Sequence, residues 1–292
     1  MKVAVTGASG LVGTALVPAL RAAGHTVLTL TRGKAENPGE VGWDIERGTI
    51  DAASLEGVDA IVHLAGESIG ERWSEGARER ILRSRVDGTG LVARTAASLD
   101  SRPALVQASA VGFYGPDDAT VTESSPQGQG FAAEVAAAWE EAAAPAREAG
   151  LRWAALRKAP IIAKEGGAIA QMLTPFKLGL GGRVGSGRQW WSWVSLEDAV
   201  RAYLHVLESE LDGAVNVAAG ALPNAEFVKA LGRATHRPTI FPLPSLAVKT
   251  MFGQMGEEML LGGQRVSSER LVSSGFTFRH ETLDDALAAA LS

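Results

Sequence analysis

The stretch "VAVTGASGLVGTAL", residues 3–16, joins an apolar, strand-like run to a helix-like segment through a turn that contains three glycines. Gly7 permits a tight turn, Gly10 lets backbone amides approach a pyrophosphate, and Gly13 lets the helix pack closely on the strand. The helix N-terminus adds donors and a dipole that favour an anion. The stretch therefore predicts a dinucleotide site, with the cofactor held by Gly7, Ser9, Gly10, Leu11, Val12 and Gly13.

Outside this turn, strand-like and helix-like segments alternate over the first 162 residues. Compact apolar runs occupy 2–7, 26–32, 58–66, 103–110 and 151–162. Apolar residues recur at helical spacing in 13–24, about 71–99 and 131–150, the last of which Pro145 interrupts. Alternation of this kind implies a parallel sheet with helices on both faces. We therefore predict an α/β protein, with a Rossmann-type doubly wound parallel sheet and a smaller α/β C-terminal cap domain.

The amino-acid composition changes after residue 162. Residues 163–194 are rich in glycine and aromatic residues and show few strand signals, whereas 196–209 and 213–219 again resemble a core helix and a core strand. We predict two domains, which are an NADP-binding core of 1–162 plus 195–220 and a substrate-binding cap of 163–194 plus 221–292.

The end of the second strand-like run bears on which nicotinamide cofactor is preferred. NAD-binding chains usually carry an acidic residue there, which binds the ribose 2′-hydroxyl. This chain has Arg32 instead, and an arginine suits a 2′-phosphate, so we predict NADP(H). The alternative is that Arg32 is a solvated charge. Asp44 is a candidate for binding the adenine amino group, or it caps a turn.

Composition excludes several classes of function. The 292 residues carry a net charge of −5 with both signs interspersed, which argues against a nucleic-acid partner. The chain has no cysteine, and its five histidines lack metal-ligand spacing, so we predict no metal site. No run of about 20 apolar residues is long enough to span a membrane. We expect a cytoplasmic protein that takes a small-molecule substrate, and a homodimer stays open.

Further motifs resemble the extended short-chain dehydrogenase/reductases of the sugar-nucleotide epimerase type. The general match lies in the glycine turn, "HLAG" (63–66), "SAVGFYG" (109–115) and an arginine and a proline within 157–160. "LAGESIGERW", "SRVDGT", "FKLGLGGRVGSGRQWWSWV" and "LLGGQRV" narrow it to an uncharacterised epimerase-family branch, formerly labelled cell-division-inhibitor-like. The resemblance covers nearly the whole chain. It implies a Rossmann core and bound NADP(H), with Leu64, Ala65, Gly66 and Pro160 also at the cofactor.

The resemblance fails at the residues that usually carry the chemistry. The superfamily uses a Tyr-x-x-x-Lys pair on the helix that follows the "YG" loop, where the lysine shares a face with the tyrosine. The helix that begins "GFAAEVAAAW" offers Phe131 and Val135 at those positions, and neither tyrosine of the chain is followed by lysine at the fourth position. The usual proton-transfer mechanism is therefore in doubt for this chain.

Four residues are candidates to replace the missing pair. Ser109 lies near the usual catalytic serine or threonine, and Tyr114 follows it closely, although Tyr114 also reads as a structural residue of its turn. Glu134 shares a helix face with Phe131 and is either an acid or base or a solvated carboxylate. Glu67 directly follows "HLAG", the strand end that should face the nicotinamide, so we expect it to line the site.

The segment "RVGSGRQWWSWV" (183–194) is the candidate substrate-binding loop. Guanidinium groups bind phosphate or carboxylate, and indole rings stack on other rings. The alternative is that the tryptophans join the cap to the core, and we expect at least one to be purely structural. Arg72, Trp73 and Arg85 are weaker candidates, because basic residues on a helix are usually solvated. The predicted substrate-binding residues are Arg183, Arg188, Gln189, Trp190 and Trp193.

Three functions are compatible with these features. The first is an NADP(H)-dependent oxidoreductase that acts on a small carbonyl or alcohol. The second is a nucleotide-sugar epimerase or dehydratase, which the absent Tyr-x-x-x-Lys pair argues against. The third is a non-catalytic NADP(H)-binding sensor or scaffold, which accounts for Phe131 and Val135 but leaves the glycine- and tryptophan-rich cap without a purpose.

Overall fold

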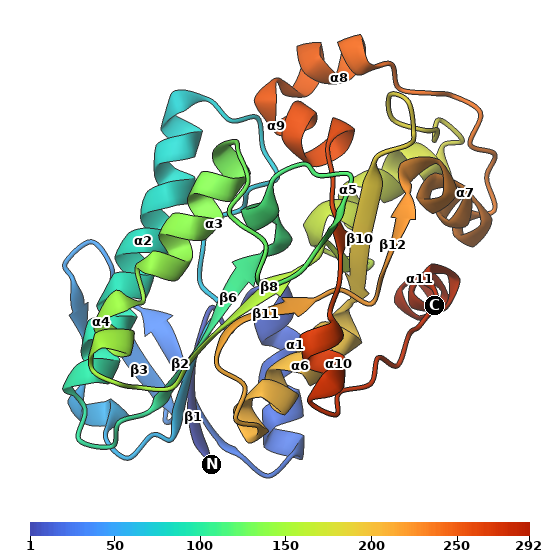
Figure 1. Cartoon of the computed structure of the whole chain (residues 1–292). Helices are drawn as coiled ribbons and strands as arrows, with labels where there is room; N and C mark the ends of the chain where they lie inside the picture. The colour runs from blue at the N-terminus through green and yellow to red at the C-terminus, as the bar shows by residue number, and fades with distance from the viewer.

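A computed structural model describes the backbone of residues 1–292 and every side chain except that of residue 168. Its main element is an 8-stranded sheet in the order β11-β8-β6-β5-β1-β2-β3-β4 (Figure 1). All neighbours in this sheet are parallel except the pair of β3 and β4. The strands are β1 (Lys2–Thr6), β2 (Thr26–Arg32), β3 (Glu40–Asp44), β4 (Thr49–Ile50), β5 (Ala60–His63), β6 (Ala104–Ala110), β8 (Trp153–Lys158) and β11 (Gly213–Val217).

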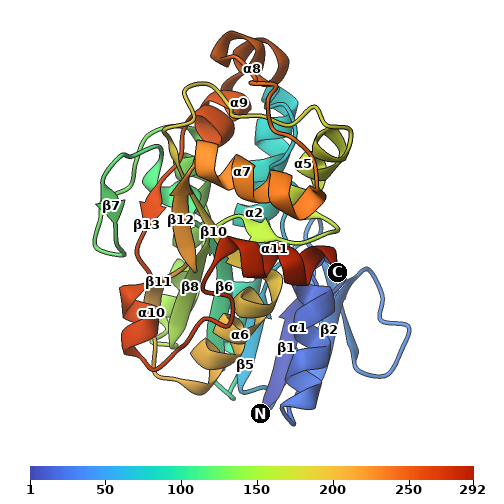
Figure 2. The same ribbon diagram turned by 90° about the vertical axis from the view of Figure 1, so that its right-hand side faces the viewer.

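Helices cover both faces of this sheet, as the doubly wound prediction requires. One face carries α1 (Leu11–Ala22) and α6 (Leu196–Glu208), which pack on each other and are nearest the viewer in the lower half of Figure 2. The other face carries α2 (Glu75–Ser98), α3 (Phe131–Glu141) and α4 (Ala144–Glu148), which also pack together. The predicted fold class is therefore confirmed.

The alternation of side chains along β1 shows why the sheet is buried on both sides. Val3 and Val5 are buried toward α1 and α6, whereas Ala4 between them is buried in a second cluster with Leu91 of α2. Successive side chains of a strand point to opposite faces, so an unbroken apolar run supplies two cores at once. Each fully buried aliphatic side chain stabilises the fold by about 1.5–3 kcal/mol relative to an exposed one.

A smaller unit lies beside the carboxyl ends of the parallel strands, at the upper right of Figure 1. Its three-stranded sheet has the order β12-β10-β9, and Trp193 and Phe227 are buried in its core. The strands are β9 (Ile161–Ile162), β10 (Trp190–Ser195) and β12 (Gly220–Pro223), with the two-stranded pair β7 (Thr120–Val121) and β13 (Arg265–Val266) nearby. The helices are α5 (Gly167–Lys177), α7 (Asn224–Thr235), α8 (Ser245–Phe252), α9 (Gln254–Gly256), α10 (Glu269–Ser273) and α11 (Leu283–Leu291).

The structure refines several predicted boundaries. The run 151–162 forms two strands, because β8 ends at Lys158 and β9 then joins the smaller sheet. The helix predicted over 131–150 is interrupted as expected, since Pro145 lies in the first turn of α4. Strand β10, which lies within the glycine- and aromatic-rich stretch, was not predicted, because polar and apolar residues do not alternate regularly in "WWSWVS".

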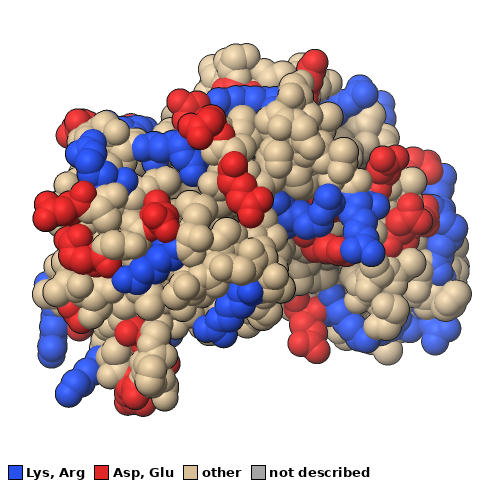
Figure 3. Space-filling model, turned by 90° about the horizontal axis from the view of Figure 1, so that it is seen from below, with Lys and Arg blue, Asp and Glu red and all other residues tan. Residues whose placement is uncertain are grey.

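The surface carries charges of both signs. Figure 3 shows lysine and arginine interspersed with aspartate and glutamate over the face seen from below.

Among the described residues, no helix combines the length and the apolar character that crossing a membrane requires. No three histidine, cysteine, aspartate or glutamate side chains among them gather in a way that could hold a metal ion.

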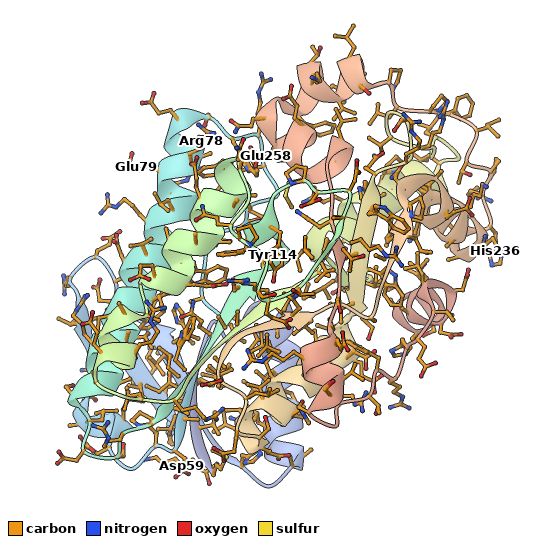
Figure 4. The ribbon with its side chains drawn as sticks, viewed as in Figure 1. Asp59, Arg78, Glu79, Tyr114, His236 and Glu258 are labelled. Carbon is orange, nitrogen blue, oxygen red and sulfur yellow. The ribbon has the colours of Figure 1, made fainter. Side chains whose placement is uncertain are left out.

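The smaller unit is tied to the core by a carboxylate that caps α3. Glu258, in the one-turn π-helical segment Glu257–Leu261, accepts hydrogen bonds from the backbone N–H of Phe131 at 3.0 Å and of Ala132 at 2.9 Å. Figure 4 labels Glu258 where the C-terminal segment meets the end of α3. The carboxylate accepts hydrogen bonds from donors that have no partner within the helix, and its negative charge is attracted to the positive end of the helix dipole.

We expect Glu258→Ala to lower the free energy of unfolding by about 1–2 kcal/mol, because it leaves two amides of α3 uncapped. Chemical denaturation of the purified protein measures this change. Glu257→Ala is the matched control, because Glu257 is exposed and makes only a surface ion pair with Lys249 at 3.3 Å. Equal losses in the two variants would contradict the capping role.

Candidate functional site

The turn between β1 and α1 has the geometry that the three glycines predicted. Gly7 has a φ of +65°, and a Cβ atom there would lie 2.8 Å from the backbone nitrogen of Ala65. A Cβ at Gly13 would lie 2.2 Å from the carbonyl oxygen of Gly7, so only glycine lets α1 approach so closely. A Cβ at Gly10 would meet only that same oxygen, at 3.3 Å. The left-handed turn at Gly7 and the close packing at Gly13 are therefore confirmed.

The first turn of α1 fits the pyrophosphate of a dinucleotide. The helix begins at Leu11 after Gly10, and no side chain caps its N-terminal amides. Ser9 and Gly10 are exposed, whereas Leu11 and Val12 are half-buried. Uncapped amides at a helix N-terminus, approached across glycine, form an anion-binding site. The residues predicted to bind the cofactor here therefore surround backbone amides that can bind a pyrophosphate.

Thr6 fixes the neighbouring end of β5 against this turn. Its hydroxyl oxygen accepts hydrogen bonds from the backbone N–H of Leu64 at 3.1 Å and of Ala65 at 3.3 Å. The hydroxyl also lies 2.8 Å from Nδ1 of His63, which is fully buried. Burial lowers the pKa of His63 to about 4, so its imidazole is neutral near pH 7. The segment of Leu64, Ala65 and Gly66, which is predicted to bind the cofactor, thus lies beside the glycine turn.

The two residues predicted to select and bind the adenosine half lie on neighbouring strands. Arg32 ends β2 with an exposed side chain, and among the described side chains it has no carboxylate at ion-pair distance. Asp44 ends β3 next to it and accepts a hydrogen bond from the backbone N–H of Arg47 at 3.0 Å. Arg32 is therefore available for a phosphate. The alternative of turn capping is observed for Asp44, and its contact with adenine stays a prediction.

Ser109 and Tyr114, two predicted catalytic residues, lie in a buried polar network. Glu140 of α3 and Arg157 of β8 form its centre through two hydrogen bonds, of 2.8 Å and 2.7 Å. The Ser109 hydroxyl donates to Glu140 at 2.6 Å, and Arg157 donates to the Tyr114 oxygen at 3.0 Å. Tyr114 in turn donates to Asn216 at 2.6 Å. Both hydroxyls are therefore engaged inside the protein.

Exposure and ionisation agree with a structural role for this network. Ser109 is 2% exposed and Tyr114 is 3% exposed. Burial raises the pKa of Tyr114 against the opposing effect of Arg157, so the phenol keeps its proton near pH 7. Glu140 was not predicted, because its only signal in the sequence is a carboxylate among the small residues of its helix.

The positions of the missing pair are apolar core positions. Phe131 and Val135 are buried in a cluster with Ile81 and Trp73, and the Phe131 ring meets Trp73 edge-on at 4.9 Å between centroids. Glu134, the third predicted catalytic residue, is exposed on α3. The space that a tyrosine and a lysine would occupy is therefore used for packing.

The carboxyl ends of β5 and β8 carry polar side chains that the internal network does not use. Glu67, the fourth predicted catalytic residue, is exposed after β5, and its backbone N–H donates to the Ser84 hydroxyl at 3.0 Å. Pro160, predicted at the cofactor, is exposed after β8. Arg85 of α2, a weaker candidate in the sequence, and Lys158 of β8, which was not predicted, also lie at these ends.

The loop that leads into β10 divides into exposed and structural residues. Arg183 and Arg188 are exposed, whereas the Gln189 amide donates to the carbonyl oxygens of Val184 and Leu260. Trp190 is half-buried under the guanidinium of Arg265, with 4.8 Å between Cζ and the ring centroid. Trp193 is 2% exposed in the core of the smaller unit, so at least one tryptophan is structural, as expected.

Comparison with known proteins identifies relatives along the whole chain. Residues 3–218 match the NAD dependent epimerase/dehydratase family, and residues 243–290 match a domain of unknown function, DUF1731. An epimerase family protein of Mycobacterium bovis is 43% identical, and the match covers 99% of this chain and 97% of that protein. The human epimerase family protein SDR39U1 is 36% identical over 98% of both chains.

Solved structures share the fold closely. The crystal structure of human SDR39U1 with NADPH has a TM-score of 0.88 and 35% identity, and the match covers 100% of this chain and 99% of that one. A nucleoside-diphosphate sugar epimerase from Corynebacterium glutamicum has a TM-score of 0.83 and 34% identity, and the match covers 100% of this chain and 58% of that one.

Proposed function

Because the chain belongs to the NAD dependent epimerase/dehydratase family, we propose that it is an NADP(H)-dependent oxidoreductase acting on a small carbonyl or alcohol. The observation that carries this proposal is the glycine turn with its uncapped helix N-terminus, next to the exposed guanidinium of Arg32. The similar human protein was crystallised with NADPH, which supports the choice of cofactor.

Each part of the cofactor has a matching group in the protein. The amides at the start of α1 suit the pyrophosphate, and Arg32 suits a 2′-phosphate through charge-assisted hydrogen bonds. The ends of β5 and β8 would border the nicotinamide, which supplies or accepts a hydride when the cofactor is bound. The protein contributes orientation and a partly desolvated setting, and Glu67 is an exposed carboxylate at that end.

A non-catalytic NADP(H) sensor is the second candidate. It is favoured by the apolar packing of Phe131 and Val135 and by the internal bonds of Ser109 and Tyr114. A sensor would bind NADPH and turn nothing over. An enzyme would oxidise NADPH in the presence of a member of a carbonyl panel, and Glu67→Gln would slow that reaction. A nucleotide-sugar epimerase would instead bind UDP- or GDP-sugars and retain its cofactor through purification.

We expect Arg32→Ala to weaken NADPH binding by about tenfold or more while leaving NADH binding unchanged. The reason is that a hydrogen bond to a charged group contributes about 1.5–3 kcal/mol, and only NADPH carries the 2′-phosphate. Fluorescence titration with both cofactors measures the two affinities.

Arg21→Ala is the matched control, because Arg21 is an exposed arginine in the last turn of α1, at the opposite end from the glycine turn. It should leave both affinities unchanged. NADH binding as tight as that of NADPH in the unmodified protein would overturn the assignment of the cofactor.

A further inference from the structure

Two cations at the nicotinamide end of the site have no anionic partner. Arg85 of α2 is 8% exposed and donates one hydrogen bond, at 3.1 Å, to the Ile81 carbonyl of its own helix. Lys158 at the end of β8 donates to the Ser109 carbonyl oxygen at 3.2 Å and to the Tyr203 hydroxyl at 3.0 Å. Among the described side chains, no carboxylate lies within 4.0 Å of either charge.

The two cations are held in place by the elements around them. The Arg85 guanidinium stacks on Trp139 of α3, with 4.8 Å between Cζ and the ring centroid. It also lies against Gly66, where a Cβ atom would be 3.6 Å from Cζ. Lys158 is fixed between β6 and α6 by its two hydrogen bonds, which leave its third N–H free. Both cations thus border the residues that follow β5 and β8.

The charge of Arg85 acts on Lys158. Burial, and then the charge of Arg85, lower the pKa of the Lys158 ammonium to about 7. Burial lowers the pKa of Arg85 to about 10, against the opposing charge of Glu67. The other groups facing Lys158 are the Ser109 carbonyl of β6 and the Tyr203 phenol of α6, whose pKa burial raises. Neither of them can neutralise an ammonium.

Two partly desolvated cations without an ion-pair partner are costly. An anion that binds both of them would offset that cost. The pyrophosphate and the 2′-phosphate have their own groups, at the start of α1 and at Arg32. The remaining partner is therefore the substrate.

We propose that Arg85 and Lys158 form an oxyanion site for the substrate, which is a carbonyl or alcohol compound that carries a carboxylate or phosphate next to its reacting carbon. The planar fork of Arg85 suits two oxygens of such a group, and the Lys158 ammonium adds a point charge. This inference rests on the proposed function, since it names the substrate class of the same site.

The test is calorimetric titration of the protein, with and without NADPH, using oxamate, methylphosphonate and the neutral lactamide. We expect oxamate or methylphosphonate to bind in the millimolar range and lactamide not to bind. The anion that binds more tightly identifies a carboxylate or a phosphate. Arg85→Gln and Lys158→Gln should each weaken binding at least about tenfold, and Arg85→Lys should recover part of it.

Arg83→Gln and Lys164→Gln are the matched controls, because both residues are exposed, and Arg83 lies on the same helix as Arg85. They should bind the anion as the unmodified protein does. Oxamate binding should weaken as the pH rises from about 6 to about 8 in the unmodified protein, since the Lys158 ammonium, with a pKa of about 7, loses its proton in this range. Lys158→Gln should lose that pH dependence.

A second measurement follows Lys158 without any ligand. Acetic anhydride labelling read by peptide mass spectrometry should place the midpoint of Lys158 near its pKa of about 7. Arg85→Gln should raise that midpoint, because it removes a repelling charge. Circular dichroism establishes that each variant is folded.

The outcomes separate the two proposals. If NADPH binds but neither anion binds at about 50 mM, the oxyanion site is wrong and the proposed cofactor stands. Equal anion affinity in Arg85→Gln and the unmodified protein also overturns it, as does equal binding of lactamide. If NADPH itself does not bind, the proposed function fails, and the titration without NADPH still decides whether the two cations bind an anion.

Discussion

Replacing Glu140 by alanine is expected to lower the free energy of unfolding by about 3–5 kcal/mol, which is the usual cost of removing one partner from a buried ion pair. Its side chain is 8% exposed, and that of its partner Arg157 is 6% exposed. The variant would leave the guanidinium without its countercharge and the Ser109 hydroxyl without its acceptor. Urea denaturation followed by circular dichroism measures the change.

Glu141→Ala is the matched control, because Glu141 is the next residue and pairs with Arg147 from a position that is 73% exposed. Surface ion pairs contribute about 0–1 kcal/mol, so this variant should be nearly neutral. Comparable losses in the two variants would show that the Glu140 network does not stabilise the fold. A double variant, Glu140→Met with Arg157→Met, should lose less than Glu140→Ala, because it leaves no unpaired charge.

The internal bonds of Ser109 and Tyr114 were not predictable from local sequence signals. Ser109 and Tyr114 stand out because hydroxyls near a strand end are common in active sites. Their partners are remote in sequence, since Glu140 is 31 residues from Ser109 and Asn216 is 102 residues from Tyr114. Whether a hydroxyl faces a cleft or a buried carboxylate depends on such long-range contacts, which spacing alone does not encode.

The geometry of the glycine turn was predictable because its signals are local. The turn after β1, the start of α1 and the end of β2 each place a residue by its neighbours in the chain. The parallel sheet followed from alternation in the same way. The cap was harder to predict, since the tryptophans of β10 pair with β12 and its last two residues pair with β9, without an alternation of polar and apolar residues.

The surroundings of Lys158 follow from the alternation of side chains along β8. It follows Arg157 at the end of a buried strand, so the two side chains must point to opposite faces. Arg157 meets Glu140 on the face of α3, which leaves Lys158 directed toward α6 and Tyr203. Two consecutive cations at the end of a core strand therefore face different surroundings, and the carboxylate that pairs with Arg157 does not serve Lys158.

The largest effect on cofactor binding is expected for Gly13→Ala. A Cβ atom there would lie 2.2 Å from the Gly7 carbonyl oxygen and 2.7 Å from Cα of Ala8, and backbone atoms cannot rotate away as a flexible side chain can. The turn must therefore move, and the N-terminal amides of α1 would no longer point toward the pyrophosphate. Loss of two hydrogen bonds to a charged group corresponds to about 100-fold or more in NADPH affinity, which fluorescence titration measures.

Gly10→Ala separates binding from folding in this experiment. Its Cβ would meet only the Gly7 oxygen, at 3.3 Å, and would otherwise enter the space that we propose for the pyrophosphate. NADPH affinity should therefore fall while the unfolding midpoint stays close to that of the unmodified protein. Gly76→Ala in the first turn of α2 is the control, since its Cβ would only touch Arg80 at 3.8 Å. Unchanged NADPH affinity in both Gly10→Ala and Gly13→Ala would mean that the turn after β1 does not bind the pyrophosphate.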